Sequence, residues 1–553
     1  MRRIAYLALK TFAPKARIFE NATKNPMAAQ NRLLLQYIAR NRHTEYGRKY
    51  HFPQIKTIDD YRMLVPISDS ESIFPYVERI RKGEDNILTK EKVIFFGLTS
   101  GTTGKPKLVP VTNFSRAKKA ETMALWAYYI SRDHPSVLDG KVLAIINPDD
   151  EDSTDSGVAV GAESGHAYKN MPGIIKRFYS IPYIAFLIQD YESRYYCILR
   201  IAMEHNVTTI ATLNPSTIVL LCRKIEGNKD ALIEDIEKGT LNKKLIIPPY
   251  IRAALENIFR PNPKRAAELR DILKEKGALL PKYFWPNLVL IECWKGGTMK
   301  LYLKELPQYF ADVPIRDFGC LSTEARSSIP IGDIGAGGVL AINTNFYEFI
   351  PKEDMGKRDR RFLLCDELEK GREYFIIVTT PGGLYRYNID DIIVVDGFFN
   401  KTPVIEFVQK GLNAVSVVGE KLYESQVNAA VNRALDKHKL LLRFFSAAAQ
   451  MEKPQHYVFL VEFDGEPAEN EKKELLQSIE EEMKKENLEY KFVRDSQLLG
   501  SPLLKVVKSG EFERYRSMRV SEGANDSQFK VPELTADPDF QKNFTVEKEI
   551  ILD

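Results

Sequence analysis

The spacing of apolar and polar positions changes along the chain. Up to about residue 90, apolar side chains recur at helical intervals, as at Leu33, Leu34, Tyr37 and Ile38, which predicts a helical opening. From Val93 onward, short β-rich runs are separated by stretches with helical spacing; these runs are 93–100, 142–147, 208–214 and 287–293. Strands that alternate with helices predict α/β layers.

A second β-rich stretch follows, with Gly and Pro at its turns, at 337–342, 374–379, 391–395 and 404–408. We place a domain boundary between Lys410 and Gly411. Beyond it, strands are expected at 414–418, 441–445 and 456–463, and helices at 424–437 and 468–486. The expected fold class is therefore α/β: a large N-terminal domain (1–410) of α/β layers with a β-rich, barrel-like subdomain, and a small C-terminal α/β domain (411–553).

Composition narrows the function classes. The 553 residues are 44% hydrophobic and 28% charged, with a formal net charge of +4, which is too mild and too evenly mixed for a nucleic-acid or membrane partner. The five cysteines form no CxxC pair, which favours a reducing, cytoplasmic setting. The apolar run at 4–9 is too short for a signal peptide or a membrane span and predicts an amphipathic first helix. We expect a monomer that acts on small molecules and has no stable membrane association.

The most informative segment is TSGTTGKPKLVP, residues 99–110, directly after an apolar run. Small residues, hydroxyls and two lysines are typical of a loop that wraps a polyphosphate, because backbone N–H groups can then approach the anion. The segment is not a Walker loop, since the second glycine of that motif would fall on Thr102 or Pro106. It predicts an anion cradle of another kind.

The loop resembles the signature of the adenylate-forming superfamily of acyl-CoA synthetases, adenylation domains and luciferases. The whole chain more closely resembles acyl acid amido synthetases of the Gretchen Hagen (auxin-responsive promoter) family, of the bacterial type. The segments that carry this resemblance, in order, are TEYGRKYHF (44–52), IFPYVERIRKGEDNILT (73–89), ATLNPSTIVLL (211–221), NFYEFIP (345–351), GLYRYNIDDIIVVDGFFNKTPVIEFV (383–408), GEKLYESQV (419–427) and SQFKVP (527–532).

The resemblance implies a two-step reaction. A carboxylic acid attacks the α-phosphate of ATP to give an acyl-adenylate and pyrophosphate, and an amino-acid amine then displaces AMP to form an amide. The residues that would bind the ATP phosphates are Ser100, Gly101, Thr102, Thr103, Gly104 and Lys105.

The segment DFGCLSTEAR (317–326) resembles the superfamily's aromatic-Gly-x-Thr-Glu motif. By this resemblance Thr323 would hold the α-phosphate or acyl group, and Glu324 would help to hold Mg²⁺. Cys320 and Leu321 replace the usual aromatic residue and glycine. Phe318 is then the candidate to stack on adenine.

Two further positions follow from the resemblance. Asp391 would accept hydrogen bonds from the ribose hydroxyls, although Asp390 stands where the family has glycine. Lys530 corresponds to the superfamily lysine that reaches the reacting carboxylate, carried by a C-terminal domain that moves about a hinge at 410–413. Glu348 in NFYEFIP fits either a place near the nucleotide or a polar position of an alternating strand.

Two other functions stay open. An acyl-CoA ligase shares the adenylation step but uses coenzyme A as acceptor; Leu108 stands where the common ligase loop has glycine. A non-catalytic nucleotide- or acyl-binding homologue would fit the departures at Cys320, Leu321 and Asp390. A metal-dependent hydrolase is disfavoured, because the seven histidines form no HExxH-type cluster.

Overall fold

A computed structural model describes residues 12–98, 107–149, 152–296, 299–411, 414–418, 420, 422–522 and 529–552. The helix expected at 4–9 lies outside these ranges. The chain forms two compact units, one made of Met1–Gly296 and Glu305–Phe407 and the other of Gly297–Lys304 and Val408–Asp553. The fold is α/β in both, with a large N-terminal and a small C-terminal part, as expected from the sequence.

The helical opening is confirmed. Its helices begin at residues whose side chains bond to free N–H groups of the first turn: Asn25 accepts from Ala28 N, and capping boxes start at Thr57 and Asp69. The helices are α2 (Ala13–Ala22), α3 (Pro26–Asn41), α4 (Glu45–Lys49), α5 (Ile58–Leu64) and α6 (Ser70–Arg81).

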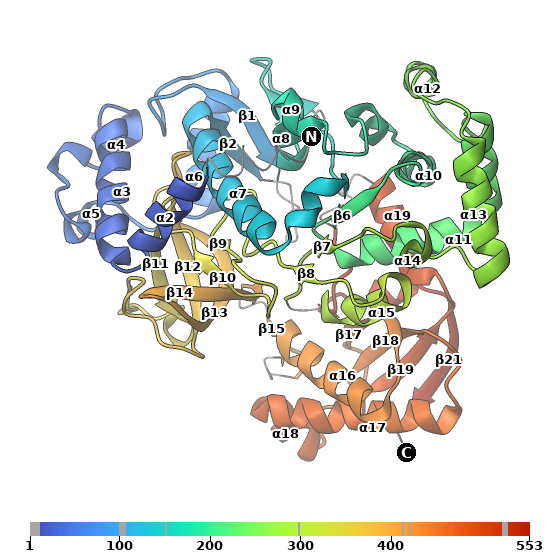
Figure 1. Ribbon diagram of the computed structural model, residues 1–553. Coiled ribbons are helices and arrows are strands. Elements are labelled where there is room, and N and C mark those ends of the chain that lie inside the picture. The colour runs from blue at the N-terminus through green and yellow to red at the C-terminus, as the bar shows by residue number, and fades with distance from the viewer. Residues whose placement is uncertain are drawn as a thin grey trace. The chain divides into compact units, whose positions relative to one another are not determined.

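The second β-rich stretch forms a six-stranded sheet in the order β11-β12-β13-β14-β10-β9. Helix α3 lies beside it, because the Gln30 side chain donates to the carbonyls of Ile342 and Asn345 and accepts from Tyr347 N; Figure 1 shows these blue helices next to the yellow strands. The strands are β9 (Ser328–Ile329), β10 (Gly338–Leu340), β11 (Phe346–Pro351), β12 (Glu373–Thr379), β13 (Tyr387–Phe399) and β14 (Thr402–Lys410).

A smaller sheet in the order β2-β1-β5-β4 contains the strands on both sides of the Gly- and Thr-rich loop. Strands β1 (Val93–Leu98) and β2 (Leu108–Thr112) pair antiparallel up to Leu98 and Leu108, and β2 leads directly into α7 (Asn113–Asp133). Strand β1 also pairs in parallel with β5 (Ala159–Gly161), which precedes α8 (Glu163–Lys169). The remaining strand is β4 (Asp152–Ser153).

The third sheet of this unit is parallel, in the order β3-β6-β7-β8. Ala144, Ala211, Glu292 and Arg316 form one row across it, so the segments that follow them leave from one edge. Its strands are β3 (Lys141–Ala144), β6 (Val207–Ala211), β7 (Leu290–Glu292) and β8 (Ile315–Arg316). The helices of this part of the chain are α9 (Gly173–Lys176), α10 (Tyr191–Ala202), α11 (Pro215–Lys238), α12 (Pro249–Glu256), α13 (Pro263–Lys276), α14 (Pro281–Phe284) and α15 (Lys300–Phe310), of which α15 has residues in both units.

The second unit has a five-stranded sheet in the order β20-β17-β18-β19-β21 and a β15-β16 pair. Apolar side chains of α16 and α17 pack with the sheet into one core. The strands and helices expected at 424–437, 441–445, 456–463 and 468–486 are confirmed, whereas the strand expected at 414–418 is limited to Ala414–Val415. The elements of this unit are β15 (Ala414–Val415), β16 (Leu422–Tyr423), α16 (Glu424–His438), β17 (Leu442–Gln450), β18 (His456–Phe463), α17 (Glu469–Glu486), α18 (Leu488–Asp495), β19 (Leu503–Val507), α19 (Glu511–Ser521), β20 (Leu534–Thr535) and β21 (Val546–Ile551).

Short 3-10 helices complete the description: η1 (Phe52–Gln54), η2 (Pro135–Asp139), η3 (Tyr183–Leu187), η5 (Lys352–Asp354) and η6 (Phe540–Asn543). None of the helices in the described ranges is both long and apolar enough to cross a bilayer.

Candidate active site

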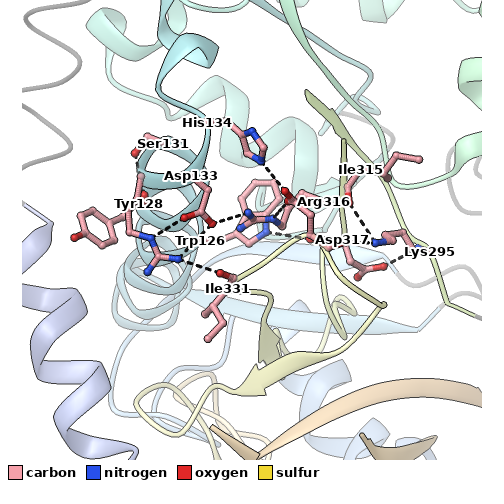
Figure 2. A network of polar contacts seen from close by, with 12 residues as sticks. Trp126, Tyr128, Ser131, Asp133, His134, Lys295, Ile315, Arg316, Asp317 and Ile331 are labelled. Carbon is pink, nitrogen blue, oxygen red and sulfur yellow. Dashed lines mark hydrogen bonds and ion pairs between the residues drawn. The ribbon is translucent and has the colours of Figure 1, made fainter. Parts of the chain in front are cut away.

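The segment that carries Thr323 and Glu324 leaves the carboxyl end of β8, at the edge where the other parallel strands also end. Ligands of open α/β sheets bind outside this edge. A network of charges fixes the start of the segment. The Arg316 side chain is fully buried and pairs with Asp133 at 2.8 Å (Figure 2) and with Asp333 at 2.5 Å. The edge is therefore rigid where the motif begins.

Asp317 is bound from the same side. Its carboxylate accepts hydrogen bonds from the backbone N–H groups of Lys295 (2.6 Å, Figure 2) and Gly319 (2.5 Å). Burial raises the pKa of Asp317 to about 6, although these two N–H groups favour the ionised form. The Asp317 carboxylate thus joins the segments that follow β7 and β8.

Thr323 and Glu324 form the tip of a tight turn. Leu321 and Arg326 pair as an antiparallel bridge, and Ser322 N donates to the Ala325 carbonyl at 2.9 Å. A turn of this kind places its two central residues away from the sheet, where they can contact a ligand.

Glu324 is the one of these two residues that fits a cation. Its side chain is buried, at 7% exposure, yet it has no hydrogen bond or ion pair to any described residue. A carboxylate that makes no hydrogen bond or ion pair has both oxygens available to a hard cation such as Mg²⁺, which binds oxygen ligands. No group of three or more His, Cys, Asp or Glu in the described ranges could hold a metal; Mg²⁺ sites commonly use one or two carboxylates with phosphate oxygens and water.

The strand that leads into the Gly- and Thr-rich loop borders this turn. Ser100, Gly101, Thr102, Thr103, Gly104 and Lys105 lie outside the described residues, but the strand that leads into them is placed. The Thr323 hydroxyl donates to the Leu98 carbonyl at 3.1 Å, and a Cβ added at Gly97 would lie 2.6 Å from Thr323 Cγ2. Glycine at position 97 therefore permits the close approach of β1 to the Thr323 turn.

Strand β13 brings Asp391 toward the same turn. The pKa of Cys320 is raised by burial and, to a smaller extent, by nearby negative charges that include Asp391. The pKa of Tyr387, at the start of β13, is raised by burial and by the charge of Glu324. Asp391 thus lies close enough to Cys320, and Glu324 close enough to Tyr387, for their charges to change these pKa values.

The backbone explains the Asp-for-Gly departure at position 390. Asp390 has a φ of +66°, in the left-handed region that favours glycine, and its N–H donates to the Asn388 side chain at 2.9 Å. It lies in a bulge, because the pairs Phe375–Ile392 and Ile377–Asn388 leave additional residues on β13. Aspartate tolerates this conformation better than most residues.

Phe318, the candidate to stack on adenine, already stacks on another aromatic ring. Its ring stacks on Trp126, with centroids 4.8 Å apart and an interplanar angle of 26°, and the side chain is buried. One face of the ring is therefore already covered within the first unit.

Glu348 is bound by two arginine side chains. Its buried carboxylate accepts from Arg386 at 2.8 and 3.0 Å and from Arg62 at 2.9 Å, and every residue of β11 is buried. Of the two interpretations of NFYEFIP, these contacts favour a strand position that binds two arginines.

Lys530 lies in the second unit and is exposed. It is close to Glu424 at the start of α16: burial raises the pKa of Glu424, and the positive charge of Lys530 opposes that rise. Gly411, next to the expected hinge, has a φ of +63°.

Sequence reasoning missed one residue that contacts the Thr323 turn and a second residue that pairs with the first. Lys119 on α7 donates to the Thr323 carbonyl at 2.8 Å and pairs with Glu163 of α8 at 2.6 Å. The three residues come from three separate segments, so no spacing in the sequence connects them.

These features define an α/β enzyme fold whose candidate site lies at the carboxyl edge of a parallel sheet. The chain belongs to the GH3 family: it matches the GH3 family N-terminal domain at residues 15–315, the central domain at 338–410 and the C-terminal domain at 425–539. The family resemblance inferred from the sequence segments is confirmed; its bacterial subgroup stays a prediction.

Similar proteins cover nearly the full chain. An indole-3-acetic acid-amido synthetase, GH3.10 of Arabidopsis thaliana, is 27% identical over 94% of both chains. A jasmonoyl-L-amino acid synthetase, JAR4 of Nicotiana attenuata, is 28% identical over 93% of this chain and 92% of its own. The solved structure of the GH3.15 acyl acid amido synthetase has a TM-score of 0.85 at 23% identity, covering 97% of this chain and 96% of that one, and shares the fold.

Proposed function

We propose that the chain is an ATP-dependent acyl acid amido synthetase that adenylates a carboxylic acid and then transfers the acyl group to an amino-acid amine. The observation that carries the proposal is the Glu324 carboxylate, which makes no hydrogen bond or ion pair to a described residue and lies at the tip of the turn that follows β8. Membership of the GH3 family, whose similar proteins are named amido synthetases, supplies the reaction class.

In this mechanism the chain's own groups position the reactants. The Thr323 hydroxyl donates to an oxygen of the α-phosphate or of the acyl group, and the Asp391 carboxylate accepts from the ribose hydroxyls. Loop residues 100–105 donate to the β- and γ-phosphates, and Lys530 approaches the reacting carboxylate. Glu324 would hold Mg²⁺, which neutralises phosphate charge when bound.

In the second step an amine attacks the acyl carbon and AMP leaves with the electrons of the former acyl–phosphate bond. The nucleophile must lose a proton, so the reaction is faster where the amine is neutral. A cytoplasmic setting fits the five cysteines, all of which are free thiols.

ATP–pyrophosphate exchange across a panel of carboxylic acids tests the proposal. We expect exchange with at least one acid, and a rate about 10²–10³ lower in Glu324→Gln, the magnitude seen when a group that stabilises transition-state charge is removed. Glu373→Gln is the matched control, because Glu373 pairs with Lys352 on the six-stranded sheet. Exchange that is absent with every acid, or equal in Glu324→Gln and the parent, would refute the proposal.

A further inference from the structure

The Thr323–Glu324 turn is held to the rest of the first unit by two hydrogen bonds, as far as the described ranges show. One runs from the Thr323 hydroxyl to the Leu98 carbonyl (3.1 Å), and the other from the Lys119 ammonium to the Thr323 carbonyl (2.8 Å). The bonds between Ser322 and Ala325 are internal to the turn. They shape the turn but do not attach it to its neighbours.

Only one of the two attachments survives if Thr323 binds substrate. A hydroxyl donates a single hydrogen bond, and ionised phosphate or carboxylate oxygens are acceptors only. If the Thr323 hydroxyl donates to such an oxygen, its bond to Leu98 must break. The Lys119 bond uses the Thr323 carbonyl instead, so it stays intact while the hydroxyl changes partner.

Lys119 is itself held in place. Glu163, the first residue of α8, pairs with its ammonium at 2.6 Å, and the two side chains are only 19% and 25% exposed. Strand β5, just before α8, pairs Gly161 with Gly97 of β1. Lys119 of α7 therefore links Glu163 of α8 to the Thr323 turn, which also contacts the end of β1.

We propose that Lys119 is a positioning residue for adenylation, one that fixes the Thr323–Glu324 turn while the Thr323 hydroxyl binds a substrate oxygen. This inference rests on the proposed function. Lys119 acts through the turn's backbone, so its loss misplaces both Thr323 and Glu324. Misplacement of catalytic groups by about 1 Å can reduce a rate by about 10².

The kinetic test compares Lys119→Met with Lys118→Met in pyrophosphate exchange. Lys118 is the adjacent residue of α7 and pairs with Glu121 at 3.5 Å, with similar exposure, which makes it a matched control. We expect Lys119→Met to lower kcat about 10- to 100-fold while the KM for ATP changes by less than about threefold. Lys118→Met should match the parent, and Lys119→Arg should recover most of the rate, because a guanidinium can donate to both Glu163 and the Thr323 carbonyl.

Hydrogen exchange supplies a readout that needs no activity. In the ligand-free protein either bond alone keeps the turn attached, so amides of residues 320–326 should stay protected in Lys119→Met and in Thr323→Val. In the double variant they should exchange about tenfold faster or more than in either single variant. The same amides in Lys118→Met/Thr323→Val should behave as in Thr323→Val.

The outcomes separate the two proposals. A parent that is inactive with every acid refutes the proposed function, and the catalytic role of Lys119 with it. An active parent whose kcat is unchanged by Lys119→Met, or changed equally by Lys118→Met, overturns the inference alone. The inference is also overturned if amides 320–326 of the Lys119→Met/Thr323→Val variant stay as protected as in the two single variants.

Discussion

The buried carboxylate of Glu348 provides a sharp test of how the first unit is held together. Glu348 and Arg386 are 1% and 4% exposed, and Arg386 donates to both carboxylate oxygens while Arg62 donates to one of them. Replacing Glu348 by Gln keeps the side-chain volume but removes the charge. It also turns an NH₂ group toward a guanidinium donor.

The expected cost follows from these contacts. Breaking a buried ion pair by removing one partner costs about 3–5 kcal/mol, because the other charge stays buried. Arg386 keeps its bonds to the carbonyls of Arg62 (3.0 Å) and Val65 (2.9 Å), which places the loss near the lower end, about 3 kcal/mol. Glu373→Gln removes a more exposed pair with Lys352 and should cost at most about 1 kcal/mol.

Tryptophan fluorescence in urea is a suitable assay. The chain has three tryptophans, Trp126, Trp285 and Trp294, and all belong to the first unit. The signal therefore reports the unit that contains Glu348, without a contribution from the second unit.

The result also decides between the two interpretations of Glu348. If its role is structural, Glu348→Gln should keep the parent's KM for ATP within about twofold at temperatures where it is folded. A loss of stability below about 1 kcal/mol, or a KM that rises tenfold in a fully folded variant, would refute the reasoning.

Three further predictions follow from single positions. Burial raises the pKa of Glu292 to about 8, so between pH 4.5 and 8 the folded chain retains a proton that the unfolded chain releases. The free energy of unfolding should therefore fall by up to about 1.4 kcal/mol per pH unit in this range. Glu292→Gln should remove this contribution to the pH dependence of unfolding midpoints measured from pH 5 to 9. Asp390→Gly should be neutral or slightly stabilising in urea, whereas Asp390→Val should cost about 1–2 kcal/mol, because φ is positive there. Gly97→Ala should lower kcat for pyrophosphate exchange about 10- to 100-fold, because the added Cβ displaces Thr323.

Each of these has a clear contrary result. An unchanged pH slope in Glu292→Gln would mean that Glu292 is ionised in the folded chain at neutral pH. Equal stability of the Gly and Val variants at position 390 would contradict the left-handed backbone assigned there. Parent-like exchange by Gly97→Ala would show that β1 and the Thr323 turn are not in tight contact.

Much of the fold could be predicted from the sequence, because its strands are short apolar runs bounded by turn residues. The run at 456–463 coincides with β18 (His456–Phe463), and that at 93–100 contains β1. Strand β13 is longer than the predicted 391–395, because it continues through the bulge at Asp390. A polar residue with a positive φ inside a strand has no periodic signature.

No sequence pattern indicated that a short segment of the N-terminal part of the chain belongs to the second unit. Residues Gly297–Lys304 belong to the second unit although they precede its main segment by about 100 residues. Inside that unit, Lys304 pairs with Asp436 at 2.5 Å and the Tyr302 ring lies 6.2 Å from Phe444. Contacts over such sequence distances depend on the tertiary fold.

Some residues of the candidate site could be predicted from the sequence and others could not. Thr323, Glu324 and Asp391 were found because the order of family-like segments indicates them, and the structure adds what the sequence lacks: the burial of Glu324 and its missing partner. Lys119 could not be found in this way, since its partner Thr323 lies 204 residues further along the chain. The charge of a lysine within a helix does not distinguish a surface residue from one that binds a distant carbonyl.

The central claim, amide formation through an acyl-adenylate, is tested most directly by a chase experiment. The enzyme is first incubated with ATP and an acid that supports pyrophosphate exchange, then mixed with an excess of amino acids or of coenzyme A, and the products are identified by mass. We predict an acyl-adenylate before the chase and an acyl–amino acid amide with free AMP after it. A thioester formed with coenzyme A and no amide, or an adenylate that neither acceptor consumes, would contradict the account.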